Sequence, residues 1–396
     1  MTCHEMKKIF DLGRNLKHSK FSIPKSEYEQ RVRIVREKLR DAGFDGLLAI
    51  SGYAERDGNV TYLCGHKNAF PYSARSQTIS GLGYSAFLLP VDSETTLIAP
   101  LGYQTDAVTG VDRTQTGTNL TNGIIKALTE SRLDHARLAI AGSDILPAVY
   151  LDEIRRSCPQ TSVHYRDELI SERRMIKSEN ELQLIRYASK IADKALQTAL
   201  ESIKPGMTES AVGSIARVKA MEIGADYVVR DRVQSGPEMG RLRWPFASKK
   251  KIRKGELISI DFVGWANGYG FDILRVGSAN RPTKKQRTII EAAGEATSTM
   301  CEALRSGSTV ENTISTVTKL ERHGLKVAPF GHAIGLEIVE TPYLLPGGTG
   351  TVQKNMVFCV EPDVKSGKYS VSVENEVIVT NNKPEILTKL PINAWS

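Results

Sequence analysis

Five residues in the second half of the sequence have side chains of the types that bind divalent metal ions. They are four acids and one histidine: Asp261, Asp272, His332, Glu361 and Glu374. Carboxylate oxygens combined with one imidazole suit Mn, Co, Fe or Zn. Paired ions in hydrolytic sites are held about 3.5 to 4 Å apart by bridging carboxylates of this kind. The set therefore predicts a two-metal hydrolytic site.

The two aspartates flank a predicted tight hairpin. Asn267-Gly268 is a dipeptide that favours a two-residue type I′ turn. Pairing around this turn places Asp261 opposite Leu274, so Asp272 lies diagonally on the same face of the sheet. Both carboxylates should therefore reach one ion.

The two glutamates flank a second predicted hairpin with a turn around Ser366-Gly367, which places Glu361 opposite Ser372 and Glu374 on the same face. Carboxylates gathered on neighbouring ladders repel one another unless a cation lies between them. His332 stands in the segment GHAIG, where the glycines on both sides leave room for a tight backbone. We expect it to complete the ligand set.

The chain is long enough for two domains, and its patterns divide accordingly. Residues 1–21 form an N-terminal extension. Over 22–165, a helix at 26–43 and short apolar runs such as GLLAIS and RLAIAG predict an α/β domain. A linker at 166–178 precedes a C-terminal domain at 179–396, where amphipathic helices accompany strand-like segments rich in β-branched residues, so this domain is predicted to be α+β.

Composition favours a cytoplasmic protein that binds neither membranes nor nucleic acid. The five cysteines are scattered and show no CxxC spacing, so neither a disulfide framework nor a thiolate zinc site is predicted. The basic N-terminus lacks the apolar core of a signal peptide, and no segment is apolar over the length of a membrane span. The net charge is +8, but the run Lys249-Lys250-Lys251 has no nucleic-acid-binding motif around it.

The motifs around these ligands resemble the creatinase/aminopeptidase superfamily of "pita-bread" fold, in the metallopeptidase clan that includes Xaa-Pro aminopeptidases and prolidases. The resemblance rests on RRMIKSENELQLIRYA, KPGMTE, DFVGWANGYGFDILR, FGHAIGLE, VEP and VENEVIV, with NVTYLCG in the N-terminal part. It implies an α+β protein with a C-terminal pita-bread catalytic domain and an N-terminal α/β creatinase-like domain. It also implies a homodimer.

The resemblance assigns roles to the ligands. Asp261 would bind one ion, Asp272 and Glu374 would bridge two, and His332 and Glu361 would complete the shell of the other. A metal-bridging hydroxide would be the nucleophile and Glu361 the proton shuttle. Arg275 is similar to the family arginine that orients the carboxylates.

Two histidines that peptidases of this family carry near the metals are missing. Arg243 or Trp244 stands at the first position and Val339 at the second. Arg241, Arg243 and Trp244 bring positive charge and a flat ring to the predicted pocket rim, a combination suited to a carboxylate or a small zwitterion with a cationic part. We therefore expect a rebuilt substrate pocket, which points towards enzymes of the creatinase or ectoine hydrolase type.

The N-terminal loops offer one further group of candidate residues. In many relatives the N-terminal domain of one subunit covers the active site of its partner. The residues of this chain that could act in that way are Arg56, Asp57, His66 and Tyr72. His66 would then supply a histidine that the catalytic domain lacks.

The predicted function is a dinuclear metal-dependent hydrolase that cleaves a C–N bond in Xaa-Pro dipeptides or in a related small amide. One alternative is a specialised hydrolase or lyase of the same fold, acting on a solute such as ectoine, creatine or dimethylsulfoniopropionate. The other is a non-catalytic pita-bread binding protein. A measurement of bound metal distinguishes this last alternative from the enzymes, because a dinuclear hydrolase must bind metal ions.

Overall fold

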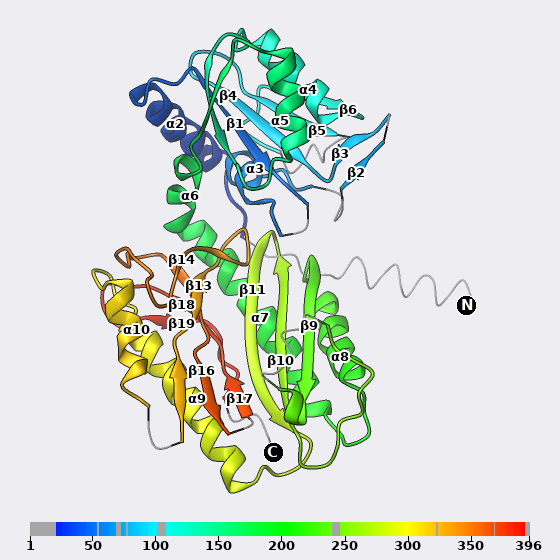
Figure 1. Cartoon of the computed structure of the whole chain (residues 1–396), viewed down its shortest axis with the longest axis vertical. Coiled ribbons are helices and arrows are strands. Elements are labelled where there is room, and N and C mark those ends of the chain that lie inside the picture. The colour runs from blue at the N-terminus through cyan, green and yellow to red at the C-terminus, as the bar shows by residue number, and fades with distance from the viewer. Residues whose placement is uncertain are drawn as a thin grey trace, which may run out of the picture. The chain divides into compact units, whose positions relative to one another are not determined.

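The computed structural model describes residues 21–53, 55–68, 73–76, 78–100, 108–239, 246–321, 324–367 and 369–392. The chain divides into two compact units. The first spans Ile23–Arg174 and the second begins at Met175. The division falls within the predicted boundary region 166–178, which is largely helical (Figure 1).

The first unit contains a six-stranded sheet, a two-stranded sheet and helices. Its elements are α2 (Lys25–Asp41), β1 (Gly46–Ser51), α3 (Gly58–Cys64), β2 (Ala74–Arg75), β3 (Ser80–Leu82), β4 (Ser85–Pro90), β5 (Thr96–Pro100), β6 (Arg113–Gly117), α4 (Leu120–Glu130), β7 (Arg137–Ala141), α5 (Ala148–Ser157), β8 (Ser162–Tyr165) and α6 (Glu168–Met175). The strand order of the six-stranded sheet is β6-β5-β4-β1-β7-β8, and β2 and β3 form the two-stranded sheet. Pairs β1/β7, β7/β8 and β5/β6 are parallel, whereas β1/β4 and β4/β5 are antiparallel.

The central strands of this sheet are buried along their whole length, which explains their unbroken apolar sequence. All six residues of β1 and of β4 are buried. Helix α4 packs against β4, β5 and β6, and α2 and α3 pack against β1. Strands covered on both faces lack the polar alternation of a half-exposed strand. The helix predicted at 26–43 corresponds to α2 and buries Val32, Val35 and Leu39.

The second unit contains three further sheets and four longer helices among its described residues. Its elements are α7 (Glu179–Ser202), α8 (Glu209–Glu222), β9 (Tyr227–Ser235), η1 (Gly236–Glu238), β10 (Leu257–Ala266), β11 (Tyr269–Ser278), α9 (Lys284–Ala303), α10 (Val310–Thr318), β12 (Lys326–Ala328), β13 (Gly331–Ala333), β14 (Glu340–Tyr343), β15 (Val357–Val360), β16 (Asp363–Ser366), β17 (Tyr369–Ser372), β18 (Asn375–Ile378) and β19 (Glu385–Ile386). The sheet orders are β11-β10-β9, β12-β16-β17 and β14-β13-β15-β18-β19.

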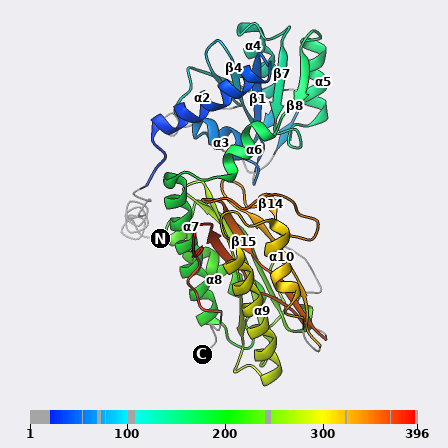
Figure 2. The same cartoon turned by 90° about the vertical axis from the view of Figure 1, so that its left-hand side faces the viewer.

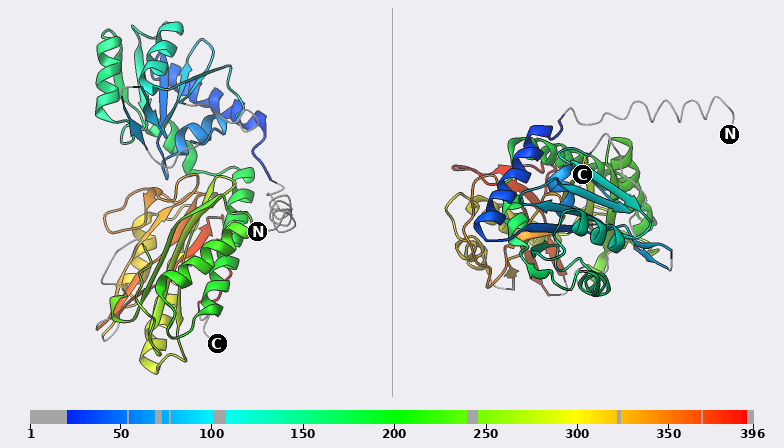
Figure 3. Two further views of the ribbon diagram at one scale, coloured as in Figure 1. Left: turned by 90° about the vertical axis from the view of Figure 1, so that its right-hand side faces the viewer. Right: turned by 90° about the horizontal axis from the view of Figure 1, so that it is seen from above.

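Helices cover these sheets in two groups, each with its own apolar core. Helices α7 and α8 pack against β9, β10 and β11, as the green helices in the left-hand view of Figure 3 show. Helix α9 packs against α10, β15, β16 and β17 (Figure 2). Both long helices begin with a capping box, formed by Ser178 with Glu181 and by Thr283 with Gln286. The predicted α+β class is confirmed.

Candidate metal centre

The first predicted hairpin forms as expected. Asn267 and Gly268 have φ values of 50° and 81°, so both turn residues adopt the left-handed conformation that a type I′ turn requires. Asp261 pairs with Leu274, and Asp272 pairs with Val263. The two aspartates therefore lie diagonally on one face, and both are buried.

The second hairpin forms with a different register. Asp363, not Glu361, pairs with Ser372, and Ser366 pairs with Tyr369. The predicted register was wrong by two residues because the turn lies one position later than Ser366-Gly367. Since side chains alternate with a period of two, a shift of two residues leaves each side chain on its original face.

Glu361 and Glu374 lie where this hairpin passes from one sheet to another. Strands β15 and β18 pair in the five-stranded sheet, and β16 and β17 pair in a three-stranded sheet. Both glutamates occupy the joints between these strands. The amide of Glu361 donates to the carbonyl of Phe330 (3.0 Å), and that of Glu374 donates to the carbonyl of Leu274 (3.0 Å). The second bond ties Glu374 to the aspartate hairpin.

His332, on β13, joins the two hairpins. Its Nε2 lies 3.9 Å from Asp272 Oδ2 and 3.8 Å from Glu361 Oε1, while Nδ1 lies 3.0 Å from the carbonyl oxygen of Ala333. A Cβ atom at Gly331 would come within 2.5 Å of the Cys359 carbonyl oxygen, so glycine is needed for β13 to approach β15. The ring thus faces the carboxylates.

Four buried residues bring potential ligand atoms within 4.8 Å of one another: Asp272, His332, Cys359 and Glu374. Cys359 was not among the predicted ligands. It pairs with His332 across β15 and β13. Strand periodicity could have identified it, because it lies two residues before Glu361 and therefore on the same face.

The carboxylates of this cluster need a cation. Burial, followed by the repulsion of neighbouring acids, raises the pKa of Asp272 and of Glu374 well above their ordinary values. Burial also lowers the pKa of His332, which favours the neutral imidazole that binds metals. Asp261 Oδ1 and Glu374 Oε1 are buried without a hydrogen-bond partner among the described residues. Orphaned acceptors beside a neutral imidazole fit divalent metal ions.

Arg275 is fully buried, and its contacts go to main-chain carbonyls, including that of the ligand Glu374, and to the side chain of Asn375. Its Nη1 donates to the carbonyl oxygen of Glu374 and its Nη2 to Asn375 Oδ1 (2.9 Å). Burial lowers the pKa of Arg275 to about 10. Its contacts therefore position Glu374 through the main chain.

Glu376 is a second supporting residue, and the sequence had not indicated it. It accepts hydrogen bonds from the amide of Asp272 (2.7 Å) and from the hydroxyl of Ser189 on α7. Burial raises the pKa of Glu376 to about 8. It fixes the backbone of a metal ligand, as outer-shell carboxylates do.

Two arginines that were not predicted lie beside Asp261. Arg232 Nη2 is 3.1 Å from Asp261 Oδ2 and Arg230 Nη1 is 3.7 Å from the same oxygen. Strand β9 pairs Arg232 with Asp261 and Arg230 with Val263, so both side chains lie on the ligand face. Asp261 is therefore in ion-pair contact with two guanidinium groups.

A cavity of about 230 Å³ adjoins the ligands in the second unit. Its wall includes Arg232, Gln234, Ser259, Phe330, Glu361 and Lys365. Glu361 is 20% exposed, compared with 9% for the side chain of Asp261 and 5% for that of Asp272. Glu361 is therefore the acidic ligand best placed to contact a molecule in this cavity.

Several of the other predicted substrate-binding residues fall outside the described residues. Arg241, Arg243, Trp244 and Tyr72 fall outside them. Val339 is 43% exposed and directly precedes β14. These roles stay predictions.

In the first unit, His66 is buried, and burial lowers its pKa to about 4. Arg56 donates to Asp144 (2.6 Å), and Asp57 accepts from the side chain of Asn68. These contacts stabilise the loops around α3. Their proposed action on a partner subunit stays a prediction.

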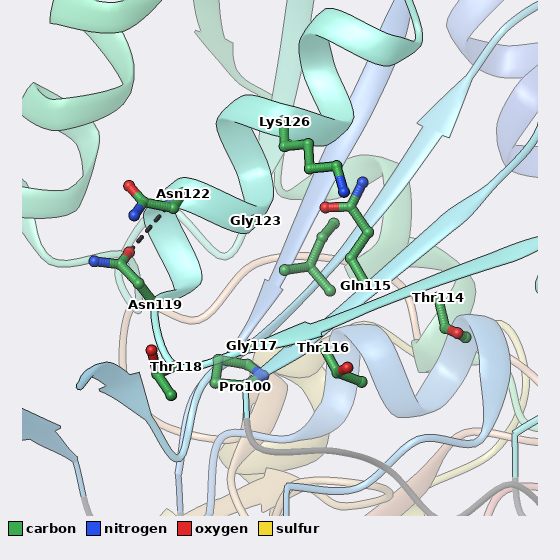
Figure 4. Close-up of a pocket in the computed structure, with 11 residues that line it drawn as sticks. Pro100, Thr114, Gln115, Thr116, Gly117, Thr118, Asn119, Asn122, Gly123 and Lys126 are labelled. Carbon is green, nitrogen blue, oxygen red and sulfur yellow. Dashed lines mark hydrogen bonds between the residues drawn. The ribbon is translucent and has the colours of Figure 1, made fainter. Parts of the chain in front are cut away.

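The first unit has a polar cavity of its own, of about 430 Å³, between β6 and the start of α4 (Figure 4). Threonines, asparagines and Gln115 line it, and Asn119 caps α4 by accepting from the amide of Asn122 (3.0 Å). Lys126 is the one charged residue in this lining. Among the residues that the structure describes, this cavity therefore offers no acid or imidazole for metal binding.

Comparisons with known proteins agree with this geometry. Residues 183–381 match the model of metallopeptidase family M24. The Xaa-Pro dipeptidase of Pyrococcus furiosus is 31% identical over 228 residues, which cover 56% of this chain and 66% of that protein. The probable dipeptidase PepE of Mycobacterium tuberculosis is 26% identical over 92% of this chain and 97% of its own length.

The fold also matches solved structures. The prolidase of Pyrococcus horikoshii superimposes with a TM-score of 0.76 at 24% identity, covering 91% of this chain and 99% of that one. Together with the match to the family model and to the dipeptidase sequences, this likeness confirms the predicted resemblance to the pita-bread superfamily. In the part of the chain that the structure describes, no helix has the length and apolar character needed to cross a membrane.

Proposed function

Because the chain belongs to metallopeptidase family M24, we propose that it is a metal-dependent hydrolase that cleaves a C–N bond in Xaa-Pro dipeptides or in a related small amide. The names of its relatives, Xaa-Pro dipeptidase and probable dipeptidase, support this substrate class. The match to the first of these spans slightly less than two thirds of that relative.

Two divalent ions, of Mn, Co, Zn or Fe, would be held by Asp261, Asp272, His332, Glu361 and Glu374. Cys359 lies among the potential ligand atoms. When bound, such ions lower the pKa of water towards about 7 and stabilise negative charge on the carbonyl oxygen of the scissile bond. The orphaned oxygens of Asp261 and Glu374 support this assignment.

Glu361 is the proposed proton shuttle, and its position on the cavity wall carries this proposal. It would accept a proton from the attacking water and return it to the leaving nitrogen. The buried side chains of Asp272 and Glu374 would act as metal ligands. His332, neutral because of burial, would bind through Nε2, since Nδ1 faces the Ala333 carbonyl.

The test is an assay of protein loaded in turn with Mn, Co and Zn against Xaa-Pro dipeptides, longer Xaa-Pro peptides and small amides. Glu361→Gln should lower kcat by about 10²- to 10⁴-fold. Glu302→Gln, which changes an exposed glutamate at the end of α9, is the matched control and should leave the rate unchanged. Equal activity in wild type and Glu361→Gln would contradict the proposal.

A second candidate is a hydrolase or lyase of a small charged solute, favoured by the arginines beside Asp261. Ectoine, creatine and dimethylsulfoniopropionate therefore belong in the same assay. A purified protein that binds no metal and gains no activity with Mn or Co would indicate a non-catalytic binding protein instead.

We also infer a homodimer in the cytoplasm. The four described cysteines are free and buried, which suits a reducing compartment. Sedimentation of the purified protein tests the dimer.

A further inference from the structure

Arg230 and Arg232 form a row of positive charge on the face of β9 that carries the metal site. Residues two apart on a strand point the same way, and both guanidinium groups reach the same oxygen of Asp261. Their side chains are 32% and 21% exposed, so both retain surface for another molecule. Asp231, between them, points to the other face and binds Arg217 (3.0 Å).

The charge of the occupied site follows from these residues and rests on the proposed function. Four acidic ligands and two arginines leave an excess of two negative charges. Two divalent ions would turn this into an excess of two positive charges, with His332 neutral. A bridging hydroxide would neutralise only one of them. The site would therefore attract one further anionic group and repel a cation.

The cavity places such a group beside the reacting bond, because Arg232 and Glu361 line the same wall. Two other charged residues of this wall, Asp363 and Lys365, lie beside each other and offset each other's charge. Asp363 accepts from the Ser370 hydroxyl (2.6 Å) and lies 3.5 Å from Lys365. Arg232 is therefore the cationic group of this wall that lies beside a predicted ligand, 3.1 Å from Asp261 Oδ2, and 21% of its side chain is exposed.

We propose that Arg230 and Arg232 form an anion subsite that selects dipeptides with an acidic side chain on the residue before the scissile bond, and that it discriminates against dipeptides with a cationic side chain there. A guanidinium group binds carboxylate in a two-pronged geometry that a neutral amide does not reproduce. A buried site built for such a partner rejects the analogue that lacks it.

The test compares the dipeptides Glu-Pro, Gln-Pro and Lys-Pro. Their first residues have long, flexible side chains that are negative, neutral and positive, respectively. Calorimetry with metal-loaded Glu361→Gln protein measures binding without turnover. We expect Glu-Pro to bind at least about 10-fold more tightly than Gln-Pro, and Lys-Pro to bind most weakly. Wild-type kcat/KM should follow the same order.

Arg232→Gln should bring the ratio of Glu-Pro to Gln-Pro binding close to one, and Arg230→Gln should lower it less. Arg232→Lys, which keeps the charge, should preserve part of the preference. Arg217→Gln is the matched control, since Arg217 binds the opposite face of β9, and should leave the ratio unchanged. Metal content and melting temperature of each variant show whether the site has stayed intact.

Equal binding of Glu-Pro and Gln-Pro by metal-loaded protein, or a preference that survives Arg232→Gln, would overturn the anion subsite. Absence of any hydrolysis would instead count against the proposed function, because binding is measured independently of turnover.

Discussion

Asp261 and Asp272 belong to one hairpin and one face, yet their surroundings differ in charge. Asp272 lies against His332, Cys359 and Glu374, where neighbouring carboxylates raise its pKa. Asp261 lies against Arg230 and Arg232. The comparison teaches that Asp272 depends mainly on metal for its charge balance, whereas Asp261 already has two arginines in ion-pair contact.

The largest expected effect is a difference in metal affinity between variants of these two aspartates. Asp272→Asn removes a ligand whose surroundings are dominated by other carboxylates and should weaken metal binding by more than about 100-fold, beyond the range for outer-shell changes. Asp261→Asn should weaken it less, by about 10-fold, because the other ligands keep their geometry. Titration of metal-free protein with Mn or Zn checks this, and equal losses in the two variants would remove the distinction.

Next in size is the effect of Arg275 on stability. Arg275→Lys loses the hydrogen bonds to Glu374 and Asn375 and leaves buried acceptors unpaired, which should lower the free energy of unfolding by about 2 to 3 kcal/mol. Urea unfolding measures this. The half-exposed Arg217→Lys serves as control. A loss no larger than that of the control would show that Arg275 does not support the ligand backbone.

A smaller effect concerns pH in the metal-free protein. The pKa values of Asp272, Glu374 and Glu376 are raised in the folded state. At a pH above the ordinary pKa of these acids, the folded state therefore binds more protons than the unfolded chain. Stability should therefore fall, by about 1 kcal/mol or more, as pH rises from about 6.5 to 8. Below about 6.5, the lowered pKa of His332 and His66 acts in the opposite direction.

Unfolding at a series of pH values with a chelator, and again with Mn, tests this prediction. Metal should remove most of the decline, and Glu376→Gln should remove part of it without metal. If the metal-free protein were most stable at pH 8, ionisation of these acids would not destabilise the folded state, and the prediction would be wrong.

The smallest effect is expected at Cys359. Cys359→Ser keeps a polar atom beside the cluster, and the oxygen and imidazole ligands remain, so metal affinity should change by less than about 10-fold. Burial raises the pKa of Cys359, so a thiol reagent should not label it in the native protein. A large loss of affinity in Cys359→Ser would instead make the thiol a principal ligand.

The accuracy of the sequence-based predictions followed the strength of the local turn signals. Asn267-Gly268 specified both turn type and register, so the positions of Asp261 and Asp272 were right. The second hairpin lacks such a dipeptide and changes sheets midway, so its register was off by two residues. Nothing local relates β9 to β10, because residues 236–256 separate them, and Arg232 opposite Asp261 could not be foreseen.

The division of the second hairpin between two sheets has a consequence for how this protein can diversify. Glu361 and Glu374 depend on the β15–β18 ladder, whereas the tip beyond them, β16 and β17, pairs with β12. Insertions or deletions at the tip would thus reshape the cavity wall around Lys365 and Ser370 while the ligands keep their register. Substrate preference can drift along a lineage at this tip without rebuilding the chemistry.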